Sequence, residues 1–118
     1  MKSSIIKDKS YAFALRIIKM YSYLTKDKKE YVLSKQVLKS GTAIGALVME
    51  AEQAQSRADF INKMNIGLKE ANETTYWLSL LKDSGYIDEQ MFNSIYPEAE
   101  ELLKILTSIV KTTKQNNG

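Results

Sequence analysis

The sequence of 118 residues predicts an all-α protein, in which four helices form an antiparallel up-down-up-down bundle. Four segments place apolar residues three and four positions apart, which is the spacing of one buried helix face. Short polar connections separate these segments, so that consecutive helices are expected to lie antiparallel. The length fits a single domain over residues 1–118, with residues 1–9 and 112–118 expected to fray.

The first helix is expected from Tyr11 to Leu24, and its apolar residues fall into two stripes. One stripe comprises Tyr11, Ala14, Ile18 and Tyr21, and the other comprises Phe13, Ile17, Met20 and Leu24. The core of a four-helix bundle covers only one stripe of each helix, so the other needs a second partner. The sequence therefore predicts a homo-oligomer, with Phe13, Ile17 and Met20 at the subunit interface.

The second helix is expected from Glu30 to Ala54, and its core positions follow helical spacing: Leu33, Val37, Gly41, Ile44, Val48 and Ala51. Gly41 and Gly45 stand four residues apart on neighbouring turns. Glycine inside a helix costs about 1 kcal/mol relative to alanine, so we expect a neighbouring helix to approach closely here. Gly45 and Met49 belong to a second line, which we assign to the subunit interface, although Met49 also fits an ordinary partly exposed methionine.

The third helix is marked by local signals at both ends. Ser56 and Asp59 have the spacing of a capping box, and Gly85 directly follows the expected end of the helix near Ser84. Trp77 lies on a face apart from the core stripe, where it would anchor a second subunit.

The fourth helix is expected to begin after Asp88, a residue type that caps helix N-termini. Its core stripe comprises Met91, Ile95, Ala99, Leu102, Leu103, Leu106, Ile109 and Val110. Pro97 lies inside this pattern, and a proline there removes one backbone hydrogen bond and clashes with the preceding turn. We therefore expect a kink or a break near residues 95–96.

The composition removes several classes of chemistry. The chain contains neither cysteine nor histidine, so it lacks thiolate ligands, imidazole ligands and the commonest general base. The acidic residues Glu70 and Glu73, with Glu50 and Glu52, fit a solvated or ion-paired face better than a metal site. We expect no catalytic residue, no metal and no cofactor, and a protein of the cytoplasm with no membrane-spanning segment.

The net charge of +3 is unevenly distributed along the chain. Residues 1–39 carry ten basic and three acidic side chains, and residues 40–118 carry seven basic and eleven acidic ones. Such asymmetry indicates either a surface that binds polyanions or subunits that join positive to negative faces. Two solvated faces that differ by chance explain it equally well.

Five lysines form the basic group that could bind nucleic acid: Lys26, Lys28, Lys29, Lys35 and Lys39. They lie in the first connection and the start of the second helix, close to Tyr23 and Tyr31 in the sequence. Lysines beside exposed aromatic rings bind phosphates and support base stacking. The group contains no motif for reading a base sequence, and a solvated loop remains the alternative.

Three segments together resemble a known bacterial family: YVLSKQVLKSGTAIGA at 31–46, AQSRADF at 54–60 and LKEANETTYWL at 68–78. They are similar to the four-helix-bundle proteins of 23S rRNA intervening sequences, which include relatives of the accessory variability determinant protein of diversity-generating retroelements. The chain departs from the family pattern at Leu47, where members often have asparagine, and at Lys39, where they often have arginine. Glu50 and Glu73 match acidic positions of the family and are candidates for a shared polar contact.

The resemblance implies a ring-shaped homo-oligomer, typically a pentamer, with no established catalytic activity and an association with RNA. It further implies a possible ribonucleoprotein partner such as a reverse transcriptase complex. We therefore expect a non-enzymatic accessory protein that binds phosphates through a basic surface. The alternative is a protein-interaction or assembly scaffold with no nucleic-acid role.

Overall fold

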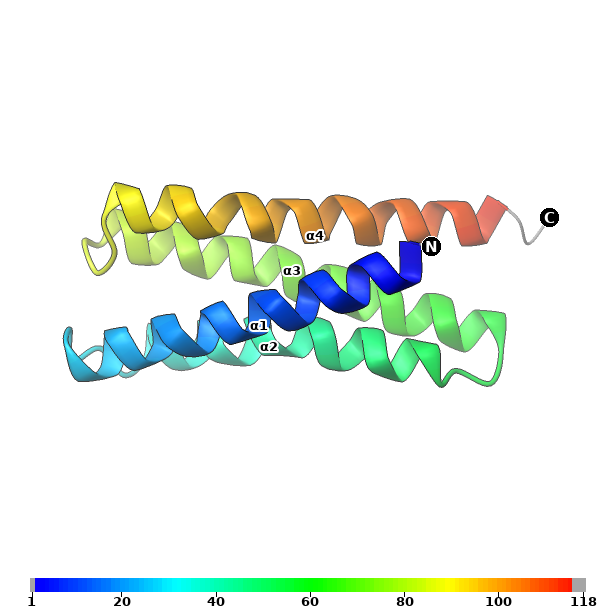
Figure 1. Ribbon diagram of the computed structural model, residues 1–118, viewed down its shortest axis with the longest axis horizontal. Helices are drawn as coiled ribbons and strands as arrows, with labels where there is room; N and C mark the ends of the chain where they lie inside the picture. Colours follow the sequence, from blue (N-terminus) through cyan, green and yellow to red (C-terminus); the bar gives the residue numbers. More distant parts are fainter. Residues whose placement is uncertain (1, 116–118) are drawn as a thin grey trace.

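Four long helices form an antiparallel bundle in the computed structural model, which describes residues 2–115 and the side chains from residue 5 onward. The helices are α1 (Lys2–Lys26), α2 (Leu33–Glu52), α3 (Arg57–Asp83) and α4 (Glu89–Gln115). The α1–α2 and α3–α4 connections lie at one end of the bundle, and the α2–α3 connection lies at the other (Figure 1). The bundle measures 50 × 21 × 19 Å. This architecture confirms the predicted fold class.

One row of side chains from each helix fills the core. The row of α1 contains Phe13, Ile17 and Leu24, and that of α2 contains Val37, Ile44 and Val48. The rows of α3 and α4 add the remaining large buried side chains, among them Met64, Leu78, Leu81, Ile95, Leu102 and Leu106. Burial of these apolar groups is the main source of stability, because helices in proteins owe most of their stability to the packing of an apolar face.

The predicted caps of α3 and α4 are present. The Ser56 hydroxyl accepts a hydrogen bond from the backbone N–H of Asp59 at 3.0 Å. The Asp88 carboxylate accepts one from the backbone N–H of Met91 at 2.8 Å. Gly85 has a φ of +86°, the left-handed conformation that glycine adopts without strain after a helix. Short-range sequence signals therefore locate these helix ends correctly.

The first helix begins earlier in the chain than the sequence indicates. Helix α1 begins at Lys2, not near Ser10, and the side chain of Ile6 is fully buried in the core. Residues 5–9, where fraying is expected, thus belong to α1, and Ile6 continues the row of Phe13 and Ile17 by about two turns. At the other end, α4 extends to Gln115, and residues 116–118 lie outside the described part of the chain.

Pro97 does not break α4, which runs as one helix through it (Figure 1). The Arg16 side chain of α1 donates hydrogen bonds to the carbonyl oxygen and the hydroxyl of Ser94, and to the Glu98 carboxylate. These contacts lie on the turn where proline cannot donate to the carbonyl of Asn93. Arg16 thus supplies polar contacts to the weakened turn. Of the kink or break expected near residues 95–96, the break is excluded, because α4 is one helix from Glu89 to Gln115.

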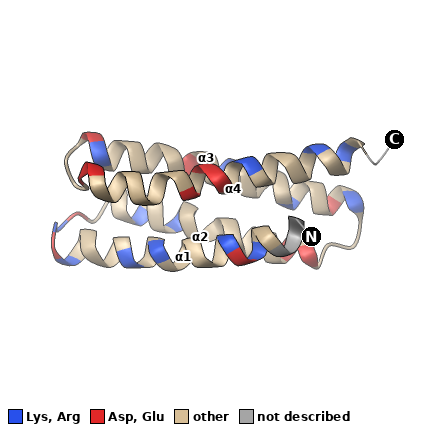
Figure 2. Cartoon of the chain, turned by 45° about the horizontal axis from the view of Figure 1, so that its top comes forward, with Lys and Arg blue, Asp and Glu red and all other residues tan. Residues whose placement is uncertain are grey.

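Ion pairs within the single chain neutralise part of the charge asymmetry seen in the sequence. Three ion pairs join basic residues of α1 to acids of the second part of the chain: Lys7–Glu52, Lys9–Glu101 and Arg16–Glu98. In Figure 2, basic segments recur along α1 and an acidic segment lies near the middle of α4. Part of the asymmetry therefore holds α1 against its neighbours.

The two glycines of α2 face α1 at different separations. A Cβ atom added to Gly41 would lie 2.8 Å from Cγ1 of the buried Ile17, which is closer than carbon atoms pack. One added to Gly45 would lie 3.5 Å from the nearest atoms of Ser10, an ordinary contact. The close helix approach predicted from the glycines is present at Gly41.

Candidate nucleic-acid interface

The connection between α1 and α2 is built around the buried carboxylate of Glu30. The residue is only 7% exposed. Its carboxylate oxygens accept hydrogen bonds from the backbone N–H groups of Val32, Leu33 and Ser34 at 3.1, 2.9 and 2.7 Å. The Ser34 hydroxyl in turn donates to the Glu30 carbonyl oxygen at 2.8 Å. Glu30 thus satisfies the exposed amides at the start of α2, where the residue at the cap position, Val32, has no side-chain acceptor.

These contacts also change the acidity of Glu30. Burial alone raises the pKa of a carboxyl group, because it penalises the charged form. The hydrogen bonds from Leu33, Ser34 and Val32 favour the charged form and outweigh burial, so the pKa of Glu30 lies below its usual value. Its negative charge is directed into the backbone amides at the start of α2.

The five lysines assigned to nucleic-acid binding are all exposed. Lys26 ends α1, Lys28 and Lys29 belong to the connection, and Lys35 and Lys39 follow on α2. None of the five forms an ion pair with any described residue. The structure therefore leaves these ammonium groups available to a polyanion.

Two of these lysines have identifiable neighbours. The Lys28 Nζ lies 5.9 Å from the ring centre of Tyr23, within cation–π range. Burial and the charge of Glu73 hold the pKa of the Glu70 carboxyl above its usual value, and the charges of Lys69 and Lys39 partly oppose this rise. Lys26, Lys28, Lys29 and Lys35 thus form the part of the basic group that interacts with no acidic residue in the ion pairs and charge effects described above, at the end opposite the α2–α3 connection; of these four, Lys28 also contacts the Tyr23 ring.

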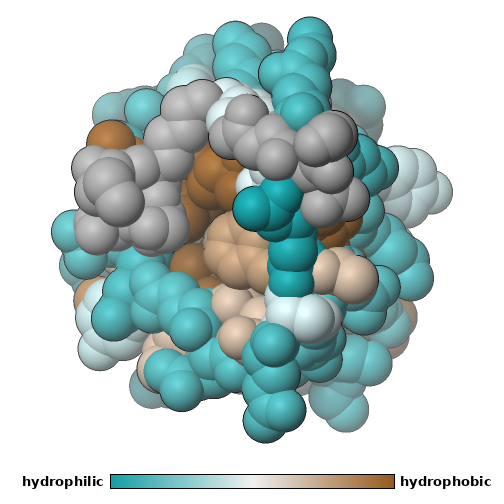
Figure 3. Space-filling view, turned by 90° about the vertical axis from the view of Figure 1, so that its right-hand side faces the viewer, coloured by the Kyte–Doolittle hydropathy of each residue, from teal (hydrophilic) through white to brown (hydrophobic). Residues whose placement is uncertain are grey.

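The opposite end of the bundle has a different surface. There, apolar side chains are visible in the middle, surrounded by a rim of hydrophilic side chains (Figure 3). This is the appearance expected where a bundle core meets solvent between helix ends. The basic group and this apolar end are separated by the long dimension of the molecule, 50 Å.

Three residues of the predicted subunit interface lie in the core of the single chain. Phe13, Ile17 and Met20 are 1%, 0% and 6% exposed, so a second subunit cannot contact them while the bundle is closed. The sequence prediction chose the wrong stripe of α1. The outward stripe instead includes Tyr11, which is 66% exposed, and its apolar neighbours Leu15 and Ile18, which are 53% and 49% exposed.

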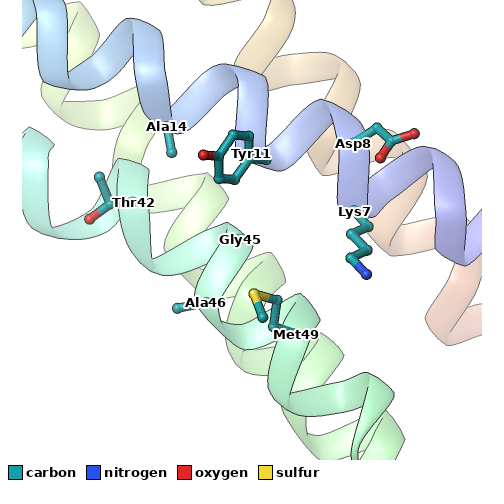
Figure 4. Close-up of a pocket in the computed structure, with 8 residues that line it drawn as sticks. All are labelled: Lys7, Asp8, Tyr11, Ala14, Thr42, Gly45, Ala46 and Met49. Atoms are coloured by element: carbon teal, nitrogen blue, oxygen red, sulfur yellow. The ribbon is translucent and has the colours of Figure 1, made fainter.

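Gly45 and Met49 line a surface groove between α1 and α2 with a volume of about 280 Å³. The α1 side of the groove includes Tyr11 and Ala14, and Thr42 lies with Gly45 and Met49 on the α2 side. The Tyr11 ring extends from α1 toward α2, and the Met49 side chain is mostly exposed (Figure 4). These two predicted interface residues therefore lie at an accessible apolar surface that continues into the outward stripe of α1.

Trp77 lies on α3, away from this groove, and is half-buried against the core. Its indole contacts the Tyr76 ring edge-on, with ring centres 5.1 Å apart. Part of the side chain is thus already covered within the chain. Its role in an interface stays a prediction.

The acidic residues do not form a shared site. Glu50 is exposed and pairs with Lys63 at 3.0 Å, and Glu73 is exposed on α3. The described residues contain no group of acids arranged to hold a metal ion. No helix in the described part of the chain is long and apolar enough to cross a membrane.

Comparison with known proteins identifies the family. The family model described as 23S rRNA-intervening sequence protein matches residues 2–108. A crystal structure of a protein of unknown function from the S23 ribosomal protein family of Bacteroides thetaiotaomicron is 57% identical, with a TM-score of 0.93, and the match covers 94% of this chain and 99% of that one. No curated protein matches the chain. The resemblance seen in the sequence is thus confirmed, and the chain belongs to the 23S rRNA-intervening sequence protein family.

Proposed function

We propose that this protein is a non-enzymatic, RNA-associated accessory protein of the cytoplasm that binds phosphates through Lys26, Lys28, Lys29 and Lys35. The observation that carries the proposal is that these four exposed lysines lack ion-pair partners among the described residues, and that one of the two acids in the connection, Glu30, is turned into the backbone, which leaves Asp27 as the exposed acid there. The family name, which refers to ribosomal RNA, favours RNA as the polyanion.

Homo-oligomerisation is part of the same proposal, with a ring as the favoured form and a pentamer as the favoured number of subunits. The outward stripe of α1 and the adjoining groove present apolar side chains that a second subunit would cover. Repetition of the basic group around a ring would give several phosphate-binding surfaces on one particle, which raises avidity.

The same groove favours a second candidate function, a protein-interaction or assembly scaffold with no nucleic-acid role. The two candidates differ in what the lysines do. In the first they bind RNA and leave assembly unchanged, and in the second they serve the contact between protein chains.

The test is the triple substitution Lys28→Ala, Lys29→Ala and Lys35→Ala. Each lysine that binds a phosphate contributes to the dependence of RNA affinity on salt, so the slope of log affinity against log salt should fall by about 2 to 3. Binding to a structured RNA would be measured by filter retention across a salt series, with light scattering on the same samples. The matched control is Lys104→Ala, Lys111→Ala and Lys114→Ala, which makes the same change in net charge with exposed residues of α4.

Loss of RNA binding only in the first triple variant, with its assembly intact, supports the proposal. Loss of assembly in that variant supports the scaffold. If the folded wild-type protein fails to retain RNA even at low salt, the RNA proposal must be abandoned.

A further inference from the structure

A second surface hollow, here called the cavity, lies between α1 and α4, in the half of the bundle that holds the basic connection, and is more open to solvent than the groove between α1 and α2. Its volume is about 480 Å³, within the range of about 300 to 1,000 Å³ typical of small-molecule sites. The buried side chains of Met20 and Ile95 line it, together with the partly buried Met91. Helix α1 packs less extensively on α4 than on α2, which leaves space between the two helices here.

The polar groups around this cavity favour an anion. Arg16 and Lys19 line it, whereas no acidic residue does. Lys19 is exposed and forms no ion pair with a described residue, so its charge is available, whereas Arg16 is engaged by Ser94 and Glu98. The nearby carboxylate of Asp88 is occupied by its cap contact with the Met91 N–H. The cavity therefore combines an apolar interior with a free cation at its edge.

Tyr23 connects this cavity to the phosphate-binding lysines. Its side chain lines the cavity, and the Lys28 Nζ lies 5.9 Å from its ring centre. A ligand in the cavity would thus have Lys19 on one side and Lys28 close by. Methionine and tyrosine side chains offer polarisable surface to a flat aromatic ring, and the two lysines offer contacts to phosphate.

We infer that the cavity between α1 and α4 binds one unpaired nucleotide, with its base against Met20, Met91 and Tyr23 and its phosphate against Lys19. Where the nucleotide belongs to an RNA, the inference rests on the proposed function, since the basic group then holds the flanking phosphates. A free mononucleotide has the same chemistry, and the two sources are separated by experiment.

The experiment uses the full chain with carbon-13 in its methionine methyl groups. Titration with adenosine 5′-monophosphate should shift the signals of Met20 and Met91 in a saturable manner. The signals of Met64, in the core, and Met49, in the groove between α1 and α2, should stay in place. Inorganic phosphate, which lacks a base, should not reproduce the shifts. The substitution Lys19→Ala should lower the affinity for the nucleotide at least several-fold.

A blocking variant tests whether RNA uses the same cavity. Gln90 is exposed at the edge of the cavity, so Gln90→Trp should fill it without disturbing the core. Affinity for single-stranded RNA should fall about tenfold, the size expected for loss of one stacked base. Asn93→Trp, on the same helix but outside the cavity, is the matched control and should bind RNA as the wild type does.

The outcomes separate this inference from the proposed function. If the methyl shifts with adenosine 5′-monophosphate persist in the triple lysine variant, they support the nucleotide site even when RNA binding fails. If, in addition, Gln90→Trp leaves RNA affinity unchanged, the site is assigned to free nucleotides. The inference is overturned if the wild type shows no methyl shifts at millimolar nucleotide, and the proposed function then stands or falls on the lysine variant alone.

Discussion

At the scale of single residues, Gly41 and Gly45 show that similar sequence features can have different physical reasons. Both lie on the side of α2 that faces α1, but only Gly41 is in contact too close for a methyl group, because the branched side chain of Ile17 packs directly on it. Gly45 faces Ser10 with room for a Cβ. Steric need explains the first glycine and leaves the second unexplained within the single chain.

Alanine at these two positions should therefore change stability in opposite directions. Gly41→Ala should destabilise the protein by about 1 to 2 kcal/mol, since overpacking against Ile17 exceeds the gain in helix propensity. Gly45→Ala should stabilise it by up to about 1 kcal/mol, because only the propensity gain remains. Urea unfolding followed by circular dichroism gives both values. Equal destabilisation by both substitutions would contradict this account of the helix contact.

At the scale of elements, the start of α2 depends on a residue outside the helix. Glu30 precedes α2 by three residues, and its carboxylate accepts the backbone N–H groups of the first turn. The residue just before it, Lys29, has a φ of +54°, a left-handed conformation that is uncommon for residues other than glycine. The basic connection and the cap of α2 thus form one structural unit.

This unit should make stability depend on pH in acid. The pKa of Glu30 is lower in the folded than in the unfolded chain, so its contribution is present above the unfolded value near 4.5 and is lost as pH falls toward the folded value. Glu30→Gln should lower stability at pH 7 by about 1 to 2 kcal/mol and reduce the further loss between pH 5 and pH 3. Unfolding in urea at several pH values measures this.

The matched control for Glu30 is Glu100→Gln, which removes the charge of an exposed acid on α4. Its stability at pH 7 should change by less than about 0.5 kcal/mol. If Glu30→Gln retained the full acid sensitivity of the wild type, Glu30 would not be the group responsible.

At the scale of the whole molecule, one long side of the bundle remains apolar although its core is complete. Tyr11, Leu15 and Ile18 project outward from α1, and Met49 projects from α2 beside them. Exposed apolar patches of this kind mark protein interfaces in soluble proteins. One of the three ion pairs of α1, Lys7–Glu52, lies at the edge of this side, because Lys7 also lines the groove between α1 and α2.

The double substitution Tyr11→Glu and Met49→Glu should therefore dissociate the proposed oligomer. Two carboxylates on the apolar surface would have to be desolvated in the assembly, which costs several kcal/mol per interface. Light scattering at micromolar concentration should report a mass well above 13.4 kDa for the wild type and close to 13.4 kDa for the variant. Asn93→Glu, on an exposed position of α4, should assemble normally, and a monomeric wild type would refute the interface.

The sequence predicts the fold better than it predicts the surface, and particular residues show why. Ser56, Gly85 and Asp88 act on their own turns, so their effects can be inferred locally. The two stripes of α1 are both apolar, and which one faces the core depends on the three other helices. The extension of the Phe13 stripe back to Ile6 is the signal that could have identified the buried side.

In the candidate sites, too, local features could be predicted from the sequence, and contacts between distant residues could not. The basic group was predictable because most of its lysines are near one another in the chain, whereas the inward turn of Glu30 depends on backbone geometry. The cavity between α1 and α4 joins residues about seventy positions apart, such as Tyr23 and Met91, and no local pattern connects them. Pro97 is a strong local signal for a kink or a break in the helix, but hydrogen bonds from Arg16 on α1 stabilise the turn before it.

The buried hydroxyl groups of Ser40 and Thr74 have a consequence for how α2 and α3 align. They lie 2.9 Å apart, and the Thr74 hydroxyl is also 2.8 Å from the Glu70 carbonyl oxygen. A slip of one helical turn, about 5.4 Å, would separate the two hydroxyls; Thr74 would keep its hydrogen bond to the Glu70 carbonyl of its own helix, but Ser40 would lose its buried partner. Apolar surfaces tolerate sliding, but the hydrogen bond between these two hydroxyls forms in a single register, so it favours one alignment of the two helices.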